Sequence, residues 1–239
     1  MLKRLVLAVG ALALTAPAAA DSFMPPGVTT SYSPSRSAVV TVVPTALSCA
    51  PQEADCEPAA RAVIEAVHGA YRSNGRTVKL VNRDAPGQVL VTDDGARLLT
   101  VNEYAAAGFG ENTLVVYDDK GTVIARHSLA DFLPAEYING LPRTASTIRW
   151  WAGEHVIEPN SHKAILSINL VDDDTGIPRA DTMTEFKLAL DLDTGEIEAP
   201  SGPRWERALN CARSNAWLVP DTAAERQRER FRKLCRAQG

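Results

Sequence analysis

The stretch that decides the fold spans residues 88–129 and reads QVLVTDDGARLLTVNEYAAAGFGENTLVVYDDKGTVIARHSL. It contains four short runs rich in Val, Leu, Ile and Tyr, and such runs favour β-strands. Tight turns, Asp93-Asp94-Gly95 and Asp119-Lys120-Gly121, join the first run to the second and the third to the fourth. Because turns of this kind connect antiparallel neighbours, the stretch predicts a four-stranded antiparallel meander.

Further strand-like runs flank this meander. Residues 38–43 read AVVTVV and predict a strand that Pro44 ends. Residues 59–70 fit either a helical face or a strand, and we favour the strand. Asn74-Gly75 predicts a hairpin turn within residues 71–80, since Asn-Gly is the strongest two-residue hairpin signal. After the meander, strands are expected at residues 147–151, 155–157, 164–168 and 186–190.

Residues 91–100, VTDDGARLLT, followed by residues 115–121, VVYDDKG, resemble one blade of the WD40-like or YVTN-like β-propellers. In those families the first strand ends in an Asp-Gly turn and the third in D-x-x-G. The resemblance implies repeated four-stranded blades with a period of about 40–50 residues. Asn74-Gly75, Lys120-Gly121 and Thr194-Gly195 mark three such units, whereas a closed ring takes about four to eight. We therefore expect a mainly β domain over residues 21–202, with antiparallel four-stranded meanders in a partial-propeller or sandwich-like array.

The first 20 residues have the form of a signal peptide. Lys3 and Arg4 precede an apolar run at residues 5–14, and Ala18-Ala19-Ala20 supplies the small residues that a signal peptidase needs. Pro17 and the shortness of the apolar run argue against an uncleaved anchor, and no later run approaches the ~20 apolar residues of a membrane helix. We expect a periplasmic or secreted protein, cleaved before Asp21, with no membrane span.

Residues 203–239 form a basic segment with a helical pattern. They carry 9 basic and 4 acidic side chains, whereas residues 21–202 carry 14 and 25. Thr222-Ala223-Ala224-Glu225 matches a capping box that begins the second of two helices. We favour a basic helical segment that packs on its own acidic β domain. The alternative is that Arg226, Arg230 and Lys233 contact an anionic envelope polymer. Nucleic acid is disfavoured by the acidic body.

Four cysteines in an exported chain predict two disulfides. Loop-closure entropy favours the short-range pairs Cys49–Cys56 and Cys211–Cys235. A simple antiparallel helical hairpin turning near Val219 would place Cys211 opposite residue 228, about 10 Å from Cys235 at 1.5 Å per residue. Either residues 214–220 are extended, or Cys235 pairs with the N-terminal loop.

Two constellations could carry chemistry. Glu154 and His155 could meet His162 across a hairpin at Asn160-Ser161, and a catalytic zinc needs about that ligand set. The structural interpretation, which we favour, is that both histidines flank an exposed hairpin. In a strand, the rings of Trp150 and Trp151 point to opposite faces, so we expect one ring to fill the core and the other to be exposed. The sequence does not say which, and both Trp150 and Trp151 are candidate surface contacts.

No other motif points to a reaction. The chain has no G-x-S-x-G, S-x-x-K, H-E-x-x-H, P-loop or G-x-G-x-x-G pattern. Asp172-Asp173-Asp174 lacks the alternation of calcium loops and indicates a solvated acidic loop. The sequence therefore predicts an exported, non-enzymatic β scaffold or binding module, without cofactor, for an unknown envelope protein or polymer. The alternative is a metal-dependent envelope hydrolase that uses Glu154, His155 and His162.

Overall fold

The structure is a computed structural model, and it describes residues 24–49, 58–73, 75–171, 185–215 and 222–237. The predicted signal peptide, Cys56 and Asp172-Asp173-Asp174 lie outside the described residues. The described part is mainly β, as predicted, and its antiparallel sheets form no closed barrel. None of the described helices has the length and apolar content that crossing a bilayer requires.

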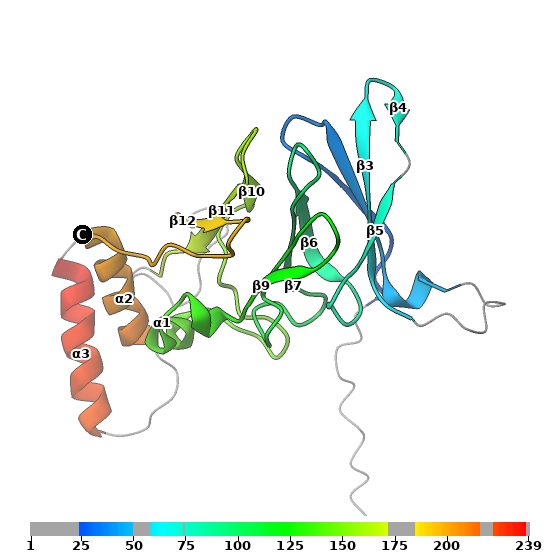
Figure 1. Cartoon of the computed structure of the whole chain (residues 1–239). Coiled ribbons are helices and arrows are strands. Elements are labelled where there is room, and N and C mark those ends of the chain that lie inside the picture. Colours follow the sequence, from blue (N-terminus) through cyan, green and yellow to red (C-terminus); the bar gives the residue numbers. More distant parts are fainter. Residues whose placement is uncertain (1–23, 50–57, 74, 172–184, 216–221, 238–239) are drawn as a thin grey trace, which may run out of the picture.

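Three sheets follow one another along the chain, and three helices complete the fold (Figure 1). The first sheet contains β1 (Thr29–Tyr32), β2 (Ala38–Val43), β3 (Arg61–His68), β4 (Tyr71–Arg72) and β5 (Arg76–Lys79). The second contains β6 (Pro86–Val91), β7 (Leu98–Glu103), β8 (Leu114–Tyr117) and β9 (Val123–His127). The third contains β10 (Val156–Ile157), β11 (Lys163–Asn169) and β12 (Glu185–Asp191). The helices are α1 (Ala135–Gly140), α2 (Pro203–Asn215) and α3 (Thr222–Ala237); the 3-10 turn η1 (Thr45–Leu47) follows β2, and the 3-10 turn η2 (Leu129–Asp131) lies between β9 and α1.

The second sheet is the predicted meander, with the strand order β6-β7-β8-β9 and antiparallel pairing throughout. Its two tight turns depend on Gly95 and Gly121, whose φ angles are 70° and 81°. Glycine adopts such left-handed angles without the steric cost that a Cβ would add. The glycines that predicted these two turns are therefore the residues whose backbone angles the turns require.

Both faces of the second sheet are buried, which explains why every residue of β8 is apolar and why β7 is buried from Leu98 to Asn102. Alternate residues such as Leu98 and Tyr117 belong to the core shared with the first sheet. Their neighbours Leu99 and Val116 belong to the core shared with the third sheet and the helices. The second sheet is thus the central layer of the array, as Figure 1 shows.

The first sheet corrects one predicted turn. The strand expected at residues 59–70 is present as β3, but the chain reverses at Gly69-Ala70, and both β4 and β5 pair with β3. The hairpin predicted at Asn74-Gly75 is therefore wrong. A Cβ on Gly75 would lie 2.6 Å from Val63 Cγ1 of β3, so this glycine permits a close approach to β3 instead of a turn.

In the helical segment α2 packs against α1, and α3 packs on α2. Trp205 of α2 contacts Tyr137 and Phe186, with ring centroids 4.4 Å and 5.7 Å apart. The predicted Cys211–Cys235 disulfide is present, with a Cα–Cα distance of 4.9 Å. Cys235 lies near the end of α3, so α3 begins about 14 Å beyond the end of α2 and returns along it (Figure 1). This offset removes the geometric objection to the pairing.

Candidate functional site

The structure does not bring the predicted zinc ligands together. In the β10–β11 hairpin Val156 pairs with Ile165, and along this register His155 and His162 lie four residues apart, roughly 13 Å. Among the described residues, no group of three or more His, Cys, Asp or Glu side chains is placed to hold a metal ion. Glu154, His155 and His162 therefore form no metal centre.

His155 is part of the core. Its side chain is 3% exposed and stacks on Trp150, with ring centroids 4.8 Å apart. Its Nδ1 accepts a hydrogen bond from the Ser167 backbone N–H at 3.1 Å. Burial lowers the pKa of His155 to about 4, so the imidazole is neutral near pH 7 and serves packing.

Ser167, His155 and Glu185 together resemble the composition of a hydrolase triad but not its geometry. Ser167 Oγ donates to Glu185 Oε2 at 2.7 Å and accepts from the Gly153 backbone N–H at 2.8 Å. A triad requires the histidine to take the serine proton and the carboxylate to orient the histidine. Here the carboxylate of Glu185 accepts the hydrogen bond from the Ser167 hydroxyl directly, and Ser167 is 1% exposed. The three side chains therefore stabilise the core and do not form a catalytic triad.

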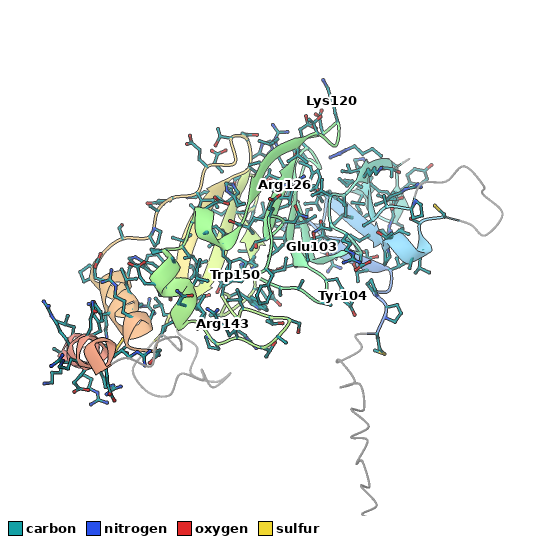
Figure 2. All side chains as sticks on the ribbon, turned by 90° about the horizontal axis from the view of Figure 1, so that it is seen from below. Glu103, Tyr104, Lys120, Arg126, Arg143 and Trp150 are labelled. Atoms are coloured by element: carbon teal, nitrogen blue, oxygen red, sulfur yellow. A yellow bond between two sulfur atoms is a disulfide. The ribbon has the colours of Figure 1, made fainter. Side chains whose placement is uncertain are left out.

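Trp150 is fully buried, so the prediction of Trp150 as a surface contact is wrong. Its indole Nε1–H donates to Asn102 Oδ1 at 2.9 Å, a core interaction that no local pattern signals. Trp151 is half-buried, with the Arg149 guanidinium 5.7 Å from its ring centroid. Figure 2 places Trp150 inside the body, whereas Lys120 projects from the β8–β9 turn.

Turns from all three sheets meet at one end of the array, which we call the turn end. Asp93, in the β6–β7 turn, accepts hydrogen bonds from the Ser35 backbone N–H at 2.7 Å and the Asn160 backbone N–H at 2.8 Å. Partial burial opposes ionisation, but these bonds outweigh it and lower the pKa of Asp93 to about 2. One carboxylate of the second sheet therefore joins the turns of the first and third.

His162 lies between two carboxylates at this end. Its Nε2 is 2.9 Å from Asp94 Oδ2 in the second sheet, and its Nδ1 is 2.8 Å from Asp193 Oδ1, which follows β12. Arg97 also binds Asp193 Oδ1, at 2.7 Å. Partial burial lowers the pKa of His162, but the hydrogen bonds and charges of Asp94 and Asp193 dominate and raise it above its ordinary value.

An open cleft of about 490 Å³ lies beside His162. A smaller one of about 240 Å³ adjoins it and is lined by Asp93, Asp94 and His162. The acidic side chains of the larger cleft are Glu158, Asp191, Asp193, Glu196 and Glu198, and its basic ones are His162 and Lys163. The turn end is thus the acidic end of the molecule.

The opposite kind of surface lies on α3. Arg226, Arg230 and Lys233 are exposed, as predicted, and their spacing places them on one side of the helix. Cys235 and Phe231 lie on the other side and contact α2, where the Arg213 guanidinium is 5.4 Å from the Phe231 ring. Leu234, between these two sides, is 39% exposed. Within the described part of the chain, no ion pair or hydrogen bond engages the three basic side chains.

A scan of the sequence against protein-family models found no match, and no curated protein matches it either. Any role for the two charged surfaces, the acidic turn end and the row Arg226–Arg230–Lys233, is therefore argued from their positions and charges in the structure.

Proposed function

We propose that this protein is an exported, non-enzymatic scaffold whose helix α3 binds an anionic polymer of the cell envelope. The observation that carries the proposal is the row Arg226–Arg230–Lys233, three exposed cations on the side of α3 that faces away from α2. Glu229, which lies three residues after Arg226 and four before Lys233, is bound to Arg232 at 2.6 Å. The row therefore keeps its positive charge available.

The way α3 is mounted supports this role. The Cys211–Cys235 disulfide and the contact of Arg213 with Phe231 fix the rotation of α3 about its axis. A linear polyanion binds such a row with little loss of entropy from the protein, because the backbone is ordered beforehand. The disulfide and the lack of a spanning helix among the described residues are compatible with an exported location.

The charge distribution favours a polymer that approaches from the α3 side. The acidic turn end repels a polyanion, and the long-range field of the protein steers it towards the basic segment. The expected packing of the basic segment on the acidic body involves α2, where Arg213 binds Glu136 of α1 at 2.9 Å. The row on α3 takes no part in that contact.

The test compares the mature protein with the variant R226Q/R230Q/K233Q for binding to immobilised dextran sulfate. We expect the variant to bind at least tenfold more weakly, and a fourfold rise in salt to weaken the parent roughly 20–40-fold, as neutralising three charges on a linear polyanion predicts. The control variant R83Q/K120Q/K163Q removes three exposed cations from the β domain and should bind as the parent does.

Equal binding by the parent and R226Q/R230Q/K233Q would overturn the proposal. So would tight binding to anionic phosphatidylglycerol vesicles without binding to dextran sulfate, because the partner would then be a lipid surface. Circular dichroism of each variant establishes that the fold is retained.

A further inference from the structure

We propose that His162 is the moving part of a pH-operated latch, which holds the tip of the β10–β11 hairpin against the second sheet in acid and releases it as the pH rises. This role is independent of the polymer-binding function proposed for α3. It rests on the position of one imidazole between carboxylates from two different sheets.

The geometry requires the charged form of the ring. An imidazolium has two N–H donors, and the two carboxylates lie at hydrogen-bond distance from its two nitrogens, 2.9 Å for Asp94 and 2.8 Å for Asp193. A neutral imidazole keeps one N–H only, so its other nitrogen would turn a lone pair towards a carboxylate. Loss of the proton therefore replaces one attractive contact with a repulsive one.

Many charged side chains surround His162, and like Asp94 and Asp193 they influence its protonation. The charged groups that face it are Asp93, Asp94 and Arg97 from the β6–β7 turn, Asp191, Asp193, Glu196 and Glu198 from β12 and the segment after it, and Glu158 and Lys163 from its own hairpin. Arg76 of the first sheet adds positive charge near Asp94. Carboxylates outnumber cations here, which favours the imidazolium.

The release is local because a second contact between the sheets does not involve His162. The Arg97 guanidinium binds Asp193 at 2.7 Å, so the segment after β12 remains attached to the second sheet when the His162 contacts are lost. The hairpin tip has His162 and the Asn160–Asp93 bond as its links to the β6–β7 turn. Deprotonation of His162 therefore loosens the tip and leaves the sheets in place.

The direction of the pH dependence follows from the raised pKa of His162. The stabilising contact is fully present below the ordinary value of 6.5 and is lost as the pH rises through the higher folded-state value. Asp93 and Asp94 both have a pKa of about 2, so they stay ionised across this window. In an exported protein the His162 contact is exposed to the pH outside the cytoplasm, so the position of the hairpin tip follows that pH.

The experiment follows His162 by NMR titration and measures amide exchange at Asn160 and Lys163, corrected for intrinsic rates, between pH 5 and 8.5. For the mature parent we expect corrected exchange at the tip to rise at least tenfold above the His162 pKa. In D94N that pKa should fall, and in H162Q the corrected exchange should not change with pH. The control H68Q removes an exposed histidine of β3 and should behave as the parent.

Two results would overturn the latch. One is an identical His162 pKa in the parent and D94N, because Asp94 would then not contact the ring in solution. The other is corrected exchange at the tip that is the same at pH 5 and pH 8.5 in the parent, because the bridge would then be a static contact.

Discussion

At the scale of single residues, Asn102 shows how one polar side chain organises a core. It adopts a φ of 60°, and its Oδ1 accepts hydrogen bonds from the Trp150 indole N–H and from the Gly108 backbone N–H, both at 2.9 Å. Buried donors are costly when unpaired, so this one amide oxygen satisfies two groups at once. It thereby anchors the loop after β7 to the segment that carries Trp150.

Gly140 is the second residue at which one atom matters, because it lets α1 and α2 approach closely. A Cβ there would lie 2.5 Å from the Ala212 Cα and carbonyl oxygen, and backbone cannot yield as a side chain does. Gly140→Ala should lower the free energy of unfolding by about 1–3 kcal/mol, measured by urea denaturation. Gly27→Ala is the matched control, since nothing lies within 4 Å of its Cβ. A Gly140→Ala variant as stable as the parent would mean that the helices are further apart.

At the scale of elements, α3 depends on its attachment. It has 16 residues, and an isolated helix of this length is marginal in water. The Cys211–Cys235 disulfide closes a loop of sequence separation 24 and joins two fully buried side chains. The disulfide therefore controls both the existence of the helix and the direction of its basic row.

C211S/C235S should lower the free energy of unfolding by about 3 kcal/mol, the amount expected for a loop of this length. It should also reduce the helical signal in far-UV circular dichroism, because α3 loses its attachment to α2. The double substitution is preferable to a reductant, since it leaves Cys49 and Cys56 as they are. Unchanged helicity with an unchanged denaturation midpoint would show that packing alone holds α3.

Elements defined by neighbouring residues were predictable, whereas contacts between distant ones were not. The second sheet follows from Asp/Gly turns that lie inside it, and the short loop between the cysteines favoured the correct partner for Cys211. The hairpin prediction at Asn74-Gly75 was wrong because Gly75 is needed for a close approach to β3, and the sequence does not distinguish such a glycine from the glycine of a hairpin turn. His162 meets Asp94 and Asp193 across 68 and 31 residues, so no spacing rule could connect them.

At the scale of the whole molecule, three sheets hold together without strand pairing between them in the described part of the chain. Two apolar cores lie on the two faces of the second sheet and supply the non-directional attraction. Orientation comes from the turn end, where Asp93 binds backbone N–H groups of both other sheets. The array therefore combines apolar stacking with a polar clasp at one end.

This clasp makes the stability of the whole array sensitive to acid. Hydrogen bonds outweigh partial burial and hold the pKa of Asp93 at about 2, below its ordinary value of 3.8. The stabilisation is therefore present above pH 3.8 and is lost as the pH falls through about 2. Asp93→Asn should be less stable than the parent at pH 7, and its stability should fall less steeply between pH 4 and 2 in urea denaturation, because one linked proton is missing. The control Asp84→Asn removes an exposed carboxylate, and its free energy of unfolding should change with pH as that of the parent does. If the free energy of unfolding of Asp93→Asn had the same pH dependence as that of the parent, Asp93 would not couple the sheets.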